Sequence, residues 1–186
     1  IYLNHNDENV LDVCAGCNGD VAGELGGAAL APAGWALVFH AHQAAATLGQ
    51  GSYNSSTMNQ DIGFSAIDGS LNASTVVWLT STSDIDEADA TIARWTPADD
   101  NSEQYVVGWA EPGSAYVYRI ARVDGAGSVL EGPVDISAQA GWGRRDDPWR
   151  RHENGDVVWA WFDDAGSTTL NVARLLSGRQ ATCTPF

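Results

Sequence analysis

The feature that most constrains the fold is a segment that recurs along the chain. Each copy has an apolar strand that contains Trp, a short polar turn, and a second strand that ends in Ala-Arg. The copies are VVWLTSTSDIDEADATIARW (76–95), VVGWAEPGSAYVYRIARV (106–123) and VVWAWFDDAGSTTLNVARL (157–175). Repetition of one hairpin at intervals of tens of residues is typical of modular β architectures. We therefore expect equivalent, mostly buried positions for Trp78, Trp109 and Trp161, and equivalent positions on the partner strands for Arg94, Arg122 and Arg174.

A further hairpin resembles these copies once a long insertion is allowed. The segment IGFSAIDG (62–69) aligns with IARVDG (120–125) when Phe64 is set on Ile120, and Ala66 then takes the place of the arginine. An apolar strand is expected upstream, at 34–43, and the polar stretch 44–60 would connect the two strands. Loops of this length in compact domains are uncommon and are often functional, although an inert surface insert is the alternative.

The remaining pattern also indicates strands. Apolar residues alternate or form short blocks rich in Val, Thr, Ile and Trp, without the periodicity of an amphipathic helix. A strand is expected over 128–137, after an Asp-Gly turn. Residues 1–33 are rich in Gly, Ala, Asn and Asp, and we expect a loop-rich N-terminal segment with a turn at Gly26 and Gly27. The sequence thus predicts a single all-β repeat domain over 34–186.

Charge and cysteine content limit the partners and the compartment. The 186 residues carry a formal net charge of −15, which disfavours binding to nucleic acids or anionic membranes, and no segment has the length and apolarity of a membrane span. The chain starts at Ile1, and its one methionine is Met58. Together with three cysteines, this start predicts a processed protein that is secreted or periplasmic, with a disulfide that involves Cys14 or Cys17 and with Cys183 tying back the C-terminus or linking to another chain.

The motif GDVVWAW (155–161), followed by a turn and LNVARL (170–175), resembles the inner strands of blades in secreted bacterial β-propeller repeat proteins, over roughly residues 34–186. The resemblance implies a propeller-like stack of hairpins. Trp109 and Trp161 are 52 residues apart, about one four-stranded blade, whereas Trp78 and Trp109 are only 31 apart. An incomplete propeller, or one that a second chain completes, is therefore expected, with a β-sandwich as the alternative.

Two histidines form the sharpest local signal for chemistry. His40 and His42 are two residues apart at the end of the expected strand, so both imidazoles would lie on one face. This geometry suits zinc or copper, with a third ligand from His5, His152 or a carboxylate such as Asp61. The alternative is two ordinary histidines beside a loop.

An arginine-rich segment gives the second candidate site. RRDDPWRRHE (144–153) holds four of the nine arginines, and Arg binds carboxylate or phosphate groups with two parallel hydrogen bonds. We predict a ligand-binding set made of Trp149, Arg150, Arg151 and His152, with Tyr53 from the 43–61 insertion. Pairing of these arginines with Asp146, Asp147 and Glu153 is the structural alternative.

Other features favour structural roles. The repeated Arg94, Arg122 and Arg174 are expected to make packing contacts or salt bridges. The acidic turn Asp84–Asp89 is expected to be an exposed hairpin tip, with calcium binding as the alternative. Because no nucleophile or nucleotide-binding motif occurs, we expect a secreted binding or structural module that takes a carbohydrate or another protein chain. The alternative is a metal-dependent enzyme, or one chain of a processed enzyme, centred on His40 and His42.

Overall fold

The computed structural model describes residues 23–41, 43, 59–97, 102–142, 149–162 and 168–178. The elements in this part of the chain are all β-strands, so the all-β prediction is confirmed. None of the described residues belongs to a helix long and apolar enough to cross a membrane. The three cysteines and the predicted disulfide lie outside the described residues, as do His42, Tyr53 and most of the insertion.

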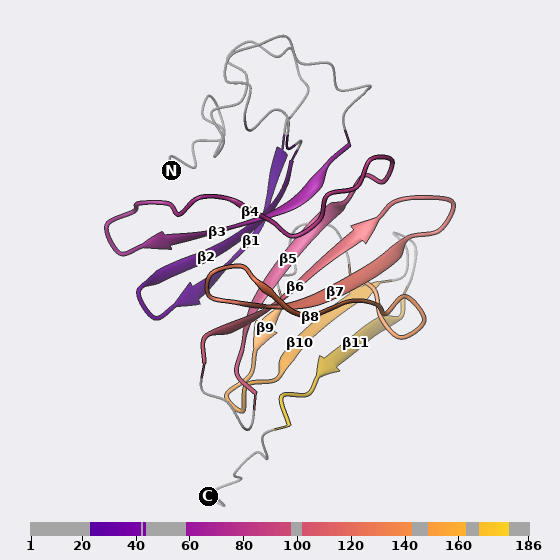
Figure 1. The fold of residues 1–186 in the computed structure, drawn as a ribbon. Coiled ribbons are helices and arrows are strands. Elements are labelled where there is room, and N and C mark those ends of the chain that lie inside the picture. Colours follow the sequence, from indigo (N-terminus) through magenta and orange to yellow (C-terminus); the bar gives the residue numbers. More distant parts are fainter. Residues whose placement is uncertain are drawn as a thin grey trace, which may run out of the picture.

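The strands form three antiparallel sheets, and each sheet is a meander in which neighbours in the sequence are also neighbours in space (Figure 1). The N-terminal sheet contains β1 (Gly23–Ala31), β2 (Gly34–Ala41), β3 (Asp61–Asp68) and β4 (Val77–Trp78). The central sheet contains β5 (Ala88–Trp95), β6 (Gln104–Glu111), β7 (Val117–Asp124) and β8 (Val129–Asp135). The C-terminal sheet contains β9 (Arg150–Arg151), β10 (Val157–Phe162) and β11 (Leu170–Leu175).

The three sheets are stacked, with the central sheet in the middle (Figure 1). One core cluster joins the N-terminal and central sheets and includes Val38, Phe64, Val107 and Trp109. A second cluster joins the central and C-terminal sheets and is built largely from Trp95, Trp142, Trp149 and Trp159. The central sheet is therefore apolar on both faces, as expected of a sheet covered on both sides. The first strands of the sheets, β1, β5 and β9, lie next to one another in that order.

Part of the predicted loop-rich N-terminal segment is a strand, because its Gly and Ala residues form β1. The turn expected at Gly26 and Gly27 is instead an irregularity inside β1, where the pairing register with β2 shifts between Leu25 and Gly27. A Cβ atom on Gly26 would lie 2.2 Å from the carbonyl oxygen of Ala90 on β5. Small residues thus let the two first strands approach closely, and β1 belongs to the same sheet as β2.

The pairing registers identify which hairpins are equivalent. Val106 pairs with Arg122 in the central sheet, and Val158 pairs with Arg174 in the C-terminal sheet. In the N-terminal sheet, Ala36 pairs with Ala66. Ala66 therefore occupies the arginine position, which confirms the predicted match between the β2–β3 hairpin and the β6–β7 hairpin.

The first of the three predicted copies is wrong. Trp78 lies on β4, which pairs with β3, whereas Arg94 lies on β5 in the central sheet. Residues 76–95 therefore connect two sheets rather than form one hairpin. Trp109 and Trp161 are equivalent, as predicted; Trp109 is buried, and Trp161 is partly buried. The described strands form open sheets, and no closed ring is formed among them.

Candidate functional site

Two opposite ends of the stack carry polar groups that the core does not use. At the first, here called the insertion end, β2 ends at Ala41, β3 begins at Asp61 and β6 ends at Glu111. At the second, here called the turn end, β5 ends at Trp95 and the turn between β9 and β10 packs beside it.

His40 lies at the insertion end and is 7% exposed. It pairs in register with Ile62 on β3, one residue before β2 ends. Among the described residues, no group of three His, Cys, Asp or Glu side chains could hold a metal ion. Because His42 lies outside these residues, the zinc or copper site at His40 and His42 stays a prediction.

Two buried carboxylates also lie at the insertion end. Asp61 accepts hydrogen bonds from the amide of Thr82 at 2.9 Å and from the hydroxyl of Thr80 at 3.4 Å. Glu87 is 1% exposed, and the Thr82 hydroxyl lies 3.4 Å from its Oε1. Burial, and then the charge of Asp61, raise the pKa of Glu87 to about 7. Sequence analysis missed this group, because a glutamate in an acidic turn carries no signal of burial.

The predicted exposed hairpin tip is only partly confirmed: Asp84 and Asp86 are exposed, whereas Glu87 is buried and Asp89 is half-buried on β5. Asp86 is exposed and accepts a hydrogen bond from the amide of Gln60 at 2.9 Å, which ties the turn to the start of β3. Asp84 is also exposed, and the Ser83 hydroxyl lies 3.4 Å from its Oδ1. Calcium binding at this turn stays a prediction.

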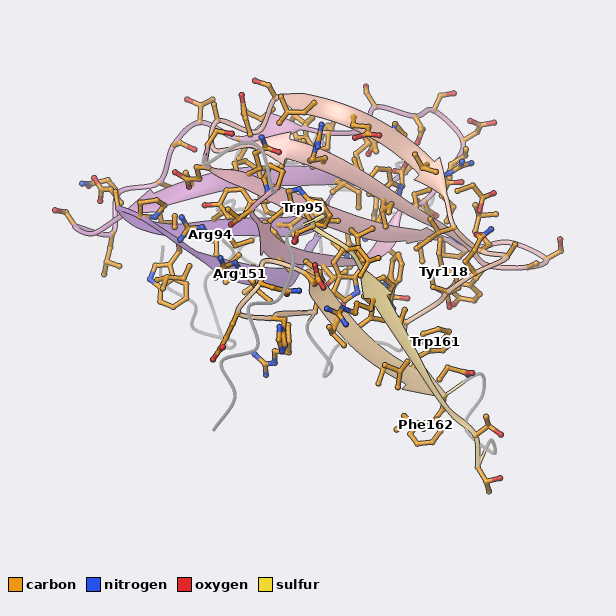
Figure 2. The ribbon with its side chains drawn as sticks, turned by 90° about the horizontal axis from the view of Figure 1, so that it is seen from below. Arg94, Trp95, Tyr118, Arg151, Trp161 and Phe162 are labelled. Atoms are coloured by element: carbon orange, nitrogen blue, oxygen red, sulfur yellow. The ribbon has the colours of Figure 1, made fainter. Side chains whose placement is uncertain are left out.

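Trp149, which was predicted to bind ligand, lies in the core between the central and C-terminal sheets. Its ring stacks on Trp159 with centroids 4.8 Å apart and meets Trp142 edge-on at 5.3 Å. Tyr118 continues this row, 4.6 Å from Trp142. Figure 2 shows Tyr118 and Trp161 on one side of the molecule, away from Arg94 and Arg151.

The other described residues of the predicted ligand set, Arg150, Arg151 and His152, are exposed at the turn end. Arg151 Nη2 donates to Thr96 Oγ1 at 3.3 Å, and His152 Nδ1 lies 3.1 Å from Asn154 Oδ1. Neither Arg150 nor Arg151 forms an ion pair with a described acidic residue, Glu153 included.

The repeated arginines separate into two kinds. Arg122 forms an ion pair with Glu131 at 3.3 Å, and Arg174 forms one with the buried Asp156. Burial alone would raise the pKa of Asp156, but hydrogen bonds from the Ser177 amide and from the Asn154 and Arg174 side chains hold it well below its usual range. The predicted structural role is thus confirmed for Arg122 and Arg174.

Arg94 is different, because its guanidinium has no such partner. It lies on β5 opposite Tyr105, and its Nε, like that of Arg122, is buried without a hydrogen-bond partner. No ion pair joins it to a described acidic residue. The carboxylate of Glu103 accepts a hydrogen bond from the hydroxyl of Tyr105. Thr96, two residues after Arg94, contacts Arg151 where β5 and β9 meet.

The sequence placed Arg94 among the structural arginines because it ends an Ala-Arg strand like the others. Arg94 differs from them in having no ion-pair partner among the described residues, and no local signal in the sequence reports that.

Comparison of the chain with protein-family models, with curated protein sequences and with solved structures found no match.

Proposed function

We propose that this chain is a secreted binding module of the β-propeller type, and that its ligand is an acidic carbohydrate whose anionic group contacts Arg94 and Arg151. The propeller assignment is supported by the three consecutive meanders and by the succession of first strands β1, β5 and β9. In a propeller, the first strands of successive blades surround a central axis, and residues on them are available to a ligand.

The observation that carries the ligand assignment is that Arg94 has no counter-charge among the residues that the structure describes. The chain has 24 acidic residues and nine arginines, so a carboxylate partner is abundant for any arginine. Arg122, Arg174 and Arg119 each have one. A buried guanidinium nitrogen without an acceptor costs free energy, and an oxyanion from a ligand would remove that cost.

Geometry and charge define the ligand further. Arg94 and Arg151 belong to different sheets, and an oxyanion that contacts both would receive hydrogen bonds from two planar donors. The Thr96 hydroxyl, which accepts a hydrogen bond from Arg151, would be a further polar contact for a sugar hydroxyl. The net charge of −15 opposes long polyanions such as nucleic acids, whereas a short acidic saccharide brings few charges near the rest of the surface.

Isothermal titration with a uronic acid disaccharide tests the proposal, with the neutral disaccharide of the same linkage as a reference ligand. We expect binding of the acidic disaccharide that weakens as salt is raised, because the contact is between charges. The double variant Arg94→Gln/Arg151→Gln should lose at least tenfold in affinity. Arg119→Gln removes one positive charge, from an arginine already paired with Glu111, and it should bind like the parent.

Equal affinity for the two disaccharides would overturn the assignment of an acidic ligand. Equal loss of affinity in Arg119→Gln would show that net charge, rather than the site at Arg94 and Arg151, controls binding. Binding of inorganic sulfate with the same affinity as the uronic acid disaccharide would reduce the site to a general oxyanion site.

A further inference from the structure

The outer face of the C-terminal sheet is apolar and exposed. Two cross-strand pairs of β10 and β11, Ala160 with Val172 and Phe162 with Leu170, place their side chains on one face. Phe162, Leu170 and Val172 are 53%, 56% and 65% exposed. The opposite face of the same strands carries Val157 and Trp159, which are buried against the central sheet. The strands therefore have apolar residues on both faces, although the described residues cover only one of the two faces.

The register shows what this face corresponds to elsewhere in the molecule. Because Val158–Arg174 corresponds to Val106–Arg122, Ala160 and Val172 correspond to Gly108 and Ile120 of the central sheet. There, the same face is covered by the C-terminal sheet. Ile120 packs against that tryptophan-rich core cluster, and the ring of Trp149 lies directly over Gly108.

We infer that the outer face of β10 and β11 is an interface for one further β-meander of the same repeat type, supplied by another polypeptide segment. That meander would contact β10 and β11 as the C-terminal sheet contacts β6 and β7. This interface is independent of the ligand proposed at Arg94 and Arg151. A sheet that is apolar on both faces is characteristic of the interior of a stack, and exposed apolar patches of this kind mark interaction sites.

One residue specifies the shape of the occupant. A Cβ atom on Gly108 would lie 2.4 Å from the ring of Trp149, so a tryptophan fits over this position only when it is glycine. The corresponding residue on β10 is Ala160. The incoming meander should therefore carry a side chain smaller than tryptophan at the place of Trp149.

Charge argues against a second copy of this chain as the occupant. A symmetric contact between two outer faces would bring together two chains of net charge −15 each, and repulsion between them opposes the contact. A further meander repeats a contact that the molecule already makes between its central and C-terminal sheets, with residues at equivalent positions facing the partner.

The chain itself provides a partner of the required kind. A second copy of residues 136–178, appended after Phe186, supplies the meander, and Ala160→Gly in the first copy makes room for the appended Trp149. The probe is the thiol in Val172→Cys, whose rate of labelling by an aromatic disulfide reagent is measured with and without the appended copy, after subtraction of the natural cysteines. The control is Leu71→Cys, because Leu71 is exposed at a turn of the N-terminal sheet.

We expect the appended copy to slow labelling in Val172→Cys at least tenfold while labelling in Leu71→Cys is unchanged. The appended copy without Ala160→Gly should protect the thiol less, because its tryptophan meets the alanine. Equal labelling rates in Val172→Cys with and without the appended copy would overturn the inference. A dimer of the unextended chain that Val172→Asp dissociates, seen by analytical ultracentrifugation, would also overturn it, because the occupant would then be a second copy.

Discussion

The buried carboxyl of Glu87 makes the free energy of unfolding depend on pH, because its pKa differs between the folded and unfolded chain. Its pKa is raised to about 7 in the folded chain, chiefly by burial and by the neighbouring charges of Asp61 and Glu111. In the unfolded chain the same carboxyl titrates near its ordinary value of 4.5. Between these two values the folded state binds more protons than the unfolded state, so the free energy of unfolding falls as pH rises.

We therefore predict that raising the pH from 5 to 8 lowers the free energy of unfolding by up to about 3 kcal/mol through Glu87. Glu87→Gln should remove most of this dependence and be more stable than the parent at pH 8. Asp84→Asn, at an exposed acid of the same turn, should keep the parent's dependence. Urea denaturation at the two pH values measures both effects, and identical pH dependence in the parent and Glu87→Gln would contradict the prediction.

Trp109 is the largest fully buried side chain among the described residues, and it lies between the N-terminal and central sheets. Replacement by Ala removes its contacts and leaves a cavity, so we expect Trp109→Ala to lower the free energy of unfolding by about 3–5 kcal/mol. Trp35→Ala is the matched control. Because Trp35 is 46% exposed, its replacement should lower the free energy of unfolding much less. Thermal unfolding of both variants decides the point; a melting temperature unchanged in Trp109→Ala would mean that the repeat does not form this core.

At the scale of elements, the repeat extends to the turns that follow the third strands. Asp68 Oδ1 accepts hydrogen bonds from the amides of Ser70 and Asn72, at 2.8 and 2.9 Å. Asp124 Oδ1 accepts the same pair from Ala126 and Ser128, at 2.9 and 2.8 Å. The two turns thus share one aspartate-capped geometry, which explains why the sequence carries Asp-Gly at both places.

This shared geometry requires a positive φ three residues after each aspartate. Gly127 meets the requirement with a φ of 85°, whereas Leu71 adopts a φ of 66° despite its Cβ. We predict that Leu71→Gly stabilises the fold by about 0.5 kcal/mol, because the relieved strain exceeds the added entropy of the unfolded chain.

Gly127→Ala should destabilise the fold by more than 1 kcal/mol, because its Cβ would also lie 2.7 Å from the ring of Phe64. Chemical denaturation of the two variants gives both values. Changes of the same sign for Leu71→Gly and Gly127→Ala would contradict the shared turn geometry.

Element prediction from the sequence succeeded where one hairpin forms one unit. The β6–β7 and β10–β11 hairpins, the strand at β8 and the match between β2–β3 and β6–β7 all follow from patterns inside a single hairpin. The failures concern contacts between sheets. Residues 76–95 have the pattern of a hairpin, but β4 and β5 pair with different neighbours. The glycines of β1 reflect its close approach to β5, which no local pattern reports.

The candidate site was predictable in part for the same reason. The concentration of Arg150 and Arg151 was visible in the sequence, and both lie exposed at the turn end. The inclusion of Arg94 was not predictable, because 57 residues separate it from Arg151 and only the contact between β5 and β9 relates their two strands. The insertion, His42 and Tyr53 lie outside the described residues, and the predictions about them stay open to experiment.

The whole molecule is organised by one repeated contact between sheets. The N-terminal sheet covers one face of the central sheet, and the C-terminal sheet covers the other. The outer face of the C-terminal sheet has apolar residues at the positions equivalent to those that this contact uses, but it is exposed. The central claim is therefore that Ile120 and Val172, at equivalent positions on the central and C-terminal sheets, differ in whether another sheet covers them.

The most direct test compares one substitution at two equivalent positions, Ile120→Asp and Val172→Asp. Ile120 packs against the core cluster under the C-terminal sheet, so a charge there should lower the free energy of unfolding by about 2–4 kcal/mol. Val172 is exposed, so Val172→Asp should change the free energy of unfolding by less than about 0.5 kcal/mol. Urea denaturation of the two variants measures the difference; equal costs at the two positions would contradict the stacked arrangement.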